Sequence, residues 1–105
     1  MIDWDRVAEL IRIVGEDDFA EIADMFLEEV DEVLERMEIG ESSDWEADFH
    51  FLKSSSLNLG FTDLARLCQT AENWAHEQNG EADYVAEIAA SYRASCRAFE
   101  SKRAA

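Results

Sequence analysis

Hydrophobic residues recur every three or four positions along most of the chain, which is the spacing of amphipathic helices. The pattern predicts a short first helix over about residues 4–14 and four longer helices over about 17–38, 45–59, 63–78 and 83–102. Each break between them contains one of the four glycines of the chain, and glycine commonly ends helices. Four long helices with short connections predict an all-α fold, namely an antiparallel up-down four-helix bundle with a short additional N-terminal helix.

Polar side chains stand in front of three of these helices, where an N-cap side chain can accept a hydrogen bond from a free backbone amide. Asp3 is predicted to cap the first helix, Ser42 or Ser43 the third, and Thr62 the fourth. No repeat or linker divides the chain, so we expect one domain over residues 1–105.

The third predicted helix carries a histidine away from its core-facing side. At about 100° per residue, one stripe of this helix contains Trp45, Phe49, Leu52, Ser56 and Leu59. His50 lies roughly 145° from the centre of that stripe. We therefore expect an exposed imidazole, with Lys53 and Ser54 beside it on the outer face.

Composition narrows the possible functions. The 105 residues have a formal net charge of −16, so nucleic acid and anionic membranes are not expected partners, because they carry charge of the same sign. No leader opens the chain and no apolar run approaches the roughly 18 residues that span a bilayer. These features predict a cytoplasmic protein, which we expect to be a monomer. Cys68 and Cys96 lack metal-ligand spacing and are predicted to be free thiols in the core.

The segment His50-Phe51-Leu52-Lys53-Ser54-Ser55-Ser56-Leu57-Asn58-Leu59-Gly60 resembles the signature H-x-x-K-G-S-[SA]-x-x-L-G of histidine-containing phosphotransfer (HPt) domains. Ser54 stands where the family has glycine, and this is the one clear departure. The resemblance continues in the next helix, where the family's L-x-x-L-C-x-x-x-E run is matched by Leu64, Leu67, Cys68 and Glu72.

The resemblance implies that His50 is phosphorylated on its exposed ring nitrogen. It implies that the donors and acceptors are aspartates of receiver domains, in response regulators or a hybrid histidine kinase. The chain then needs no cofactor of its own and is not an enzyme, because the receiver supplies Mg²⁺ and most of the catalytic groups. Lys53, one turn from the histidine, would place positive charge beside the phosphoryl group.

The hairpin of the third and fourth helices should bring Glu72 to the imidazole. His50 and Glu72 lie about equally far from the turn at Gly60 and Phe61, and such residues sit at the same height in a helical hairpin. Glu72 is thus expected to accept a hydrogen bond from one ring nitrogen and to leave the other nitrogen free. Leu57, Phe61 and Phe51 are expected to form an apolar rim for a docking partner, with Ser54 next to the incoming phosphoryl group.

Several alternatives stay open at this point. His50 and Lys53 are also compatible with an ordinary charged surface, and Glu72 with a solvent-facing position. The two Glu-His pairs at i, i+4, Glu46 with His50 and Glu72 with His76, have a spacing used by some metal sites, although carboxylate-bridged bundles use i, i+3 instead. A degenerate bundle that binds a signalling partner without carrying phosphate is the alternative function, and Ser54 is the feature that favours it.

Overall fold

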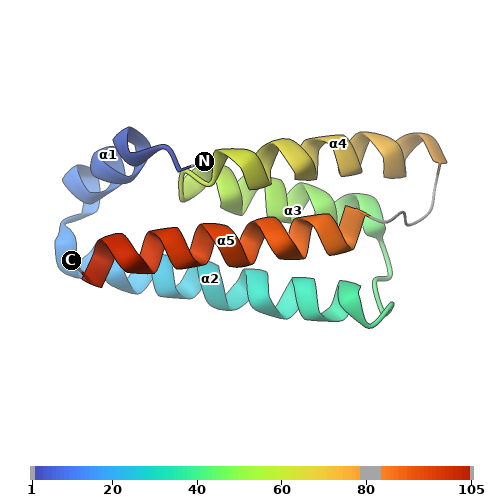
Figure 1. The fold of residues 1–105 in the computed structure, drawn as a ribbon, viewed down its shortest axis with the longest axis horizontal. Coiled ribbons are helices and arrows are strands. Elements are labelled where there is room, and N and C mark those ends of the chain that lie inside the picture. Colours follow the sequence, from blue (N-terminus) through green and yellow to red (C-terminus); the bar gives the residue numbers. More distant parts are fainter. Residues whose placement is uncertain (1, 79–83, 105) are drawn as a thin grey trace.

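The computed structural model describes residues 2–78 and 84–104, which form five helices and no strand (Figure 1). The helices are α1 (Trp4–Val14), α2 (Glu16–Glu38), α3 (Trp45–Asn58), α4 (Thr62–Gln78) and α5 (Tyr84–Ala104). Their bounds lie within two residues of the predicted ones. The predicted break at Asn79-Gly80 and the predicted helix start at Asp83 lie outside the described residues.

The four long helices run lengthwise beside one another, and α1 lies over one end of them (Figure 1). The molecule is accordingly elongated, with extents of 41 × 21 × 20 Å. The all-α fold class is confirmed. None of the described helices has the length and apolar character that crossing a lipid bilayer requires.

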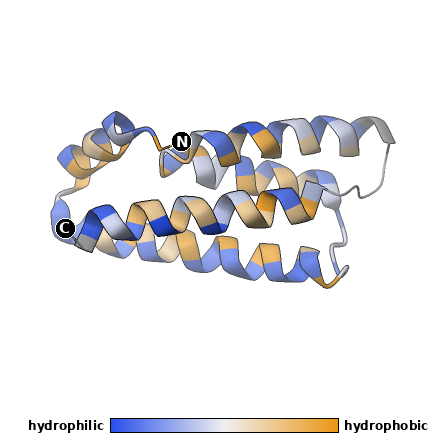
Figure 2. Ribbon diagram, viewed as in Figure 1, coloured by the Kyte–Doolittle hydropathy of each residue, from blue (hydrophilic) through white to orange (hydrophobic). Residues whose placement is uncertain are grey.

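Aromatic packing joins α1 to the bundle. Phe99 of α5 is fully buried, and its ring centroid lies 5.6 Å from that of Phe61 and 6.2 Å from those of Trp4 and Phe19. These four rings come from different parts of the chain, and aromatic pairs at such distances add to the stabilisation from burial alone. Hydrophobic and hydrophilic residues are interspersed along each helix, as the hydropathy colours show (Figure 2).

The turn between α3 and α4 is fixed by a close backbone contact with the N-terminus. Gly60 has φ of 75°, and its carbonyl accepts a 2.7 Å hydrogen bond from the amide of Asp3. A Cβ atom at this position would lie 2.6 Å from the carbonyl oxygen of Asp3. Glycine is needed here for both its backbone conformation and its lack of a side chain.

The caps differ in part from the prediction. Asp3 does cap α1, accepting from the amide of Arg6 at 3.1 Å. The cap of α3 is Asp44, which accepts from Ala47 at 3.1 Å, so the prediction of Ser42 or Ser43 was wrong. The reason is that α3 begins one residue after Asp44, which puts both serines too far upstream.

The fourth helix begins at Thr62 itself. The first backbone amide to close a helical turn there is that of Ala65, which donates to the carbonyl of Phe61 at 2.9 Å. Thr62 is therefore the first residue inside α4, and the cap position belongs to Phe61, so the prediction that Thr62 caps this helix was wrong.

Candidate functional site

His50 projects from α3 into solvent. Its side chain is 59% exposed, as expected from its angular distance to the buried stripe. Phe49 and Leu52 on either side of it are buried and hold the helix against the core. The imidazole is thus presented on a rigid helix, with little of its own surface used for packing.

Glu72 of α4 meets the imidazole from the facing helix. Its Oε2 lies 3.0 Å from Nδ1 of His50. A carboxylate accepts hydrogen bonds, so this contact favours the neutral tautomer with its proton on Nδ1 and the lone pair on Nε2. The prediction that Glu72 reaches the ring is confirmed in geometry.

Lys53 lies one turn beyond His50 and contacts two residues of α4. Its Nζ is 2.9 Å from Oε1 of Glu72 and donates to Oε1 of Gln69, also at 2.9 Å. Gln69 in turn donates through Nε2 to Asn73 at 2.8 Å, which sets the orientation of its amide. Only 19% of the Lys53 side chain is exposed, so the ammonium lies across the α3–α4 interface more than in open solvent.

Two opposing effects set the charge of Glu72. Its side chain is only 17% exposed, and burial acts to raise its pKa. Hydrogen bonds from Lys53 and His50, together with their positive charge, outweigh burial and hold the pKa of Glu72 below its ordinary value. The carboxyl group is therefore ionised at neutral pH and can act only as an acceptor.

A single antiparallel register generates these contacts. The pairs His50–Glu72 and Lys53–Gln69 have residue numbers that add up to the same value, 122. A third pair follows the same rule, since Nδ1 of His76 lies 2.7 Å from Oε2 of Glu46. Each histidine therefore contacts the glutamate of the facing helix and not the glutamate of its own helix.

His76 differs from His50 in its surroundings. Both rings are exposed and both have Nδ1 against a carboxylate, but among the described residues no ammonium takes part in the His76–Glu46 contact. Among the residues that the structure describes, no three His, Cys, Asp or Glu side chains are placed to hold a metal ion.

The three serines after Lys53 occupy different environments. Ser55 and Ser56 are buried, and Oγ of Ser56 donates to the carbonyl of Leu52 at 2.6 Å. Both are therefore small packing residues of the core. Ser54, on the His50 side of the helix, is half-buried.

The predicted apolar rim is confirmed only in part. Leu57 is 53% exposed, but Phe51 is half-buried against the core and Phe61 is 1% exposed. Phe61 was wrongly expected at the surface. After the turn at Gly60, its amide donates to the carbonyl of Ser56 at 2.8 Å, and its ring faces inward onto the aromatic core.

A shallow hollow of about 300 Å³ lies beside Lys53 in place of that rim. Its other lining residues are Leu57, Thr62, Ala65, Arg66 and Gln69. Sequence reasoning missed Ala65, Arg66 and Gln69. The antiparallel register could have found Gln69, because it lies one turn before Glu72, on the side of α4 that faces Lys53.

Both cysteines are free thiols, as predicted. Burial, with a smaller effect of the Glu72 carboxylate, raises the pKa of the Cys68 thiol to about 12. Cys68 therefore stays protonated behind the site and acts as a core residue. Cys96 is only half-buried.

Comparison with known protein families supplies the decisive observation. A family model described as Hpt domain matches residues 21–102, which are 82 of the 105 residues. The chain belongs to the Hpt domain family. Membership implies histidine phosphotransfer in a phosphorelay, and Hpt domains are typically phosphoryl carriers and not catalysts. The match covers α3, α4 and every residue of the site, whereas α1 precedes it. Searches of curated proteins and of solved structures gave no match.

Proposed function

We propose that this Hpt domain carries a phosphoryl group on Nε2 of His50 and relays it between aspartates of receiver domains. The observation that carries the proposal is the contact of Nδ1 with Glu72 on an otherwise exposed ring. It leaves the other ring nitrogen, Nε2, with a lone pair that is free to react. A neutral imidazole of this kind is a competent nucleophile near pH 7.

The transfer step is a displacement at phosphorus. Nε2 of His50 attacks the phosphorus atom of a receiver's aspartyl phosphate and forms the N–P bond. The acyl O–P bond breaks, and its electron pair stays on the aspartate as a carboxylate. The proton on Nδ1 remains hydrogen-bonded to Glu72, which stabilises the positive charge that develops on the ring. A second receiver takes the phosphoryl group by the reverse of this step.

Lys53 supplies charge for the phosphoryl oxygens. Its ammonium lies one helical turn from His50 and is held by Glu72 and Gln69 on a flexible four-carbon stem. A short movement toward the ring would exchange Gln69 for a phosphoryl oxygen as partner. Phosphoryl transfer depends mainly on positioning and on such charge stabilisation. In this proposal the receiver contributes the Mg²⁺ ion and the acceptor carboxylate.

The hollow next to Lys53 is the surface on which we place the receiver. It combines the exposed Leu57 with the aliphatic Ala65 and the cation Arg66. The chain has a net charge of −16, so it offers no long-range attraction to a partner that is also acidic. Apolar contact at Leu57 would then supply much of the affinity, with local basic groups setting the orientation.

Incubation with a receiver domain phosphorylated on its aspartate tests the proposal. The wild type and His76→Gln should take up acid-labile, base-stable label, while His50→Gln should take up none. His76→Gln is the matched control, because His76 is also exposed and also bonded through Nδ1 to a glutamate. Label retained by His50→Gln would overturn the assignment.

Binding without phosphate transfer is the second candidate function. The observation that favours it is Ser54, whose hydroxymethyl group stands one turn from His50 where the family has glycine. A wild type that binds the receiver but accepts no label, and that gains transfer in Ser54→Gly, would establish this alternative.

A further inference from the structure

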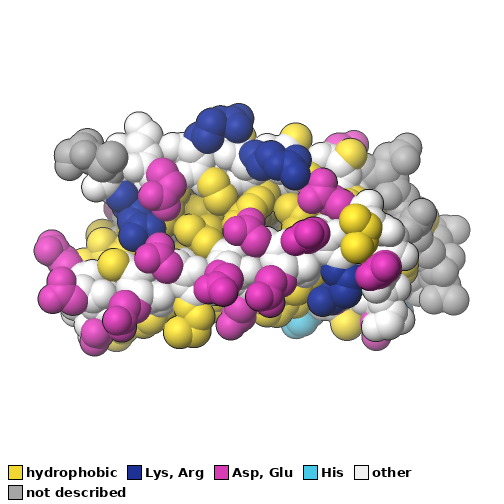
Figure 3. All heavy atoms as spheres, turned by 90° about the horizontal axis from the view of Figure 1, so that it is seen from below, with side chains coloured by type: hydrophobic (Ala, Val, Ile, Leu, Met, Phe, Trp, Pro, Cys, Tyr) yellow, Lys and Arg dark blue, Asp and Glu magenta, His cyan; other side chains and the backbone are white. Residues whose placement is uncertain are grey.

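A second hollow lies between α2 and α5, and neither helix contributes to the His50 site. Its volume is about 420 Å³, larger than the hollow beside Lys53. In the view from below, apolar surface lies in a depression between acidic side chains on one side and basic side chains on the other (Figure 3). We call this depression the α2–α5 groove and define it by Leu27 and Asp31 of α2 and by Tyr92, Arg93, Cys96, Arg97 and Glu100 of α5.

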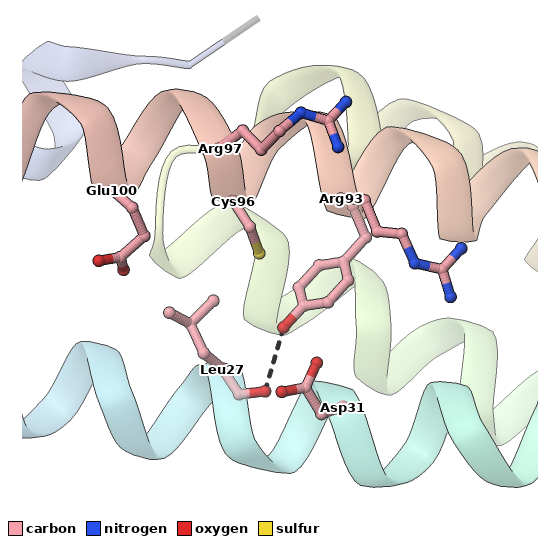
Figure 4. A pocket seen from close by; sticks show the side chains of 7 residues that line it. Leu27, Asp31, Arg93, Cys96, Arg97 and Glu100 are labelled. Atoms are coloured by element: carbon pink, nitrogen blue, oxygen red, sulfur yellow. Dashed lines mark hydrogen bonds between the residues drawn. The ribbon is translucent and has the colours of Figure 1, made fainter.

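The floor of the groove carries no charge. Leu27 and Cys96 are half-buried, and the ring of Tyr92 is buried beneath them. The Tyr92 hydroxyl donates to the carbonyl of Leu27 at 3.2 Å, so it is already satisfied (Figure 4). Burial, together with nearby Asp31, raises the pKa of Tyr92, and burial also raises the pKa of Cys96. Both groups are neutral at physiological pH, and the floor is suited to apolar side chains.

The two edges of the groove differ in charge. Asp31 stands on the acidic α2 edge, whereas the α5 edge carries two arginines, Arg93 and Arg97, and one carboxylate, Glu100 (Figure 4). Arg93 pairs with Glu38 at 3.2 Å, whereas Arg97 makes no ion pair within the part of the chain that the structure describes. A partner can therefore supply a carboxylate for Arg97 and cations for the α2 edge.

The acidic character of α2 indicates that a partner carries positive charge where it contacts this helix. Eleven of its 23 residues are acidic and one is basic, whereas α5 has four basic and two acidic residues. Like charges three and four residues apart on α2 destabilise the isolated helix. A partner with basic side chains along this edge would relieve that repulsion.

The length of the groove fits a helix. Its α5 residues run from Tyr92 to Glu100, which is about 12 Å at 1.5 Å per residue. Two turns of an incoming helix cover that length and place apolar residues at i, i+3 and i+7 on the floor. A short extended peptide would leave most of its backbone groups without partners, because α2 and α5 present side chains and no strand edge.

From these observations we propose that the α2–α5 groove binds an amphipathic helix of another protein. Its apolar stripe would lie on Leu27, Tyr92 and Cys96, with a row of Lys or Arg along α2 and an acidic residue at Arg97. A second copy of this chain is a poorer occupant, because two chains of charge −16 repel each other. Such a partner could stay bound while His50 reacts with a receiver.

A designed peptide tests the groove directly, because its sequence follows from the apolar floor and the two charged edges alone. The probe is a fluorescein-labelled helix of about 18 residues, or five turns, with a leucine stripe flanked by lysines on one side and glutamates on the other. A scrambled peptide of the same composition is the control for general attraction to an acidic protein. We expect the ordered peptide to bind at least about tenfold more tightly than the scrambled one.

Variants of the protein locate the binding. Arg97→Glu should weaken binding at least about fivefold, while Arg12→Glu, an equal charge change on an exposed arginine of α1, should alter it less than about twofold. Leu27→Asn, a change in the floor of the groove, should also weaken binding. If this variant folds poorly, the exposed Arg97→Glu variant still tests the proposal. Equal binding of ordered and scrambled peptides, or equal effects of the two arginine variants, would overturn the proposal. Dimers in sedimentation that Arg97→Glu dissociates would overturn it in favour of self-association.

Discussion

Nδ1 of His50 lies 3.0 Å from Oε2 of Glu72, across the interface of two helices that begin 17 residues apart. The second oxygen of the same carboxylate lies 2.9 Å from the ammonium of Lys53. A single side chain therefore sets the tautomer of the imidazole and holds the cation one turn away from it. This double contact makes Glu72 the residue through which the geometry of the site is most easily tested.

Glu72→Gln should make the stability of the protein less dependent on pH. Burial tends to raise the pKa of Glu72, but Lys53 and His50 lower it below the ordinary value of 4.5. A carboxyl group with a lower pKa in the folded state stabilises the fold above its unfolded-state pKa, and this contribution is lost as pH falls through the folded-state pKa. The difference in urea-unfolding free energy between wild type and variant should be largest near neutral pH and should shrink below 4.5. A constant difference over that range would contradict the proposed electrostatics.

Lys53→Ala should slow phosphoryl transfer from a receiver at least about tenfold, which corresponds to about 1.4 kcal/mol of barrier. It should also lower the free energy of unfolding by about 1 kcal/mol, because Glu72 loses a partner in a place with little exposure to water. Single-turnover labelling and urea unfolding measure the two effects. Gln69→Ala is the control, since it removes the second contact of Lys53 and leaves the ammonium. An unchanged transfer rate in Lys53→Ala would show that the lysine is structural.

Ser54→Gly should change the transfer rate less than about tenfold, or about 1.4 kcal/mol of barrier. Serine is small, and its hydroxyl can turn back to the carbonyl of His50 or donate to a phosphoryl oxygen. The variant should lose up to about 1 kcal/mol of stability, because glycine inside a helix increases the entropy of the unfolded chain. Both quantities are measured on purified protein. A large gain in transfer would mean that serine obstructs the approach of the receiver.

Gly60→Ala should be more destabilising than Gly40→Ala. Both glycines have positive φ, 75° and 77°, so both variants suffer backbone strain of about 1–2 kcal/mol. Only at Gly60 does the new methyl group meet an obstacle, the carbonyl oxygen of Asp3 at 2.6 Å, whereas nothing lies within 4 Å at Gly40. We expect an additional loss of at least about 1 kcal/mol. Equal unfolding free energies for the two variants would mean that the N-terminus moves aside without cost.

The helical period alone predicted much of the fold and the position of His50. The constant rotation per residue of an α-helix determines which residues face the core. This was enough to place His50 outside and Phe49 inside. Counting residues from the turn was enough to bring Glu72 to the imidazole. Both inferences depend on regular backbone geometry, which is the same in every helix.

Residues at the helix ends could not be placed in this way. Phe61 directly follows the turn, where the chain reverses and the helical angle no longer applies, and its ring enters the core. Ser42, Ser43 and Asp44 are all competent caps, and the start of α3 depends on how the connection from α2 closes. The partial burial of Lys53 likewise depends on the facing helix, because Gln69 and Glu72 of that helix contact its ammonium.

The three contacts between α3 and α4 all require the same antiparallel register. They therefore allow only one number of residues between their partners along the chain. In each pair the two residue numbers add up to 122, as they do for His50 with Glu72, Lys53 with Gln69 and Glu46 with His76. Insertion of one residue within α4 ahead of Gln69 would rotate everything after it by about 100° and separate all three pairs at once. A point substitution alters one or two contacts of this site, but a single-codon insertion or deletion within α4 ahead of Gln69 would disrupt all three pairs together.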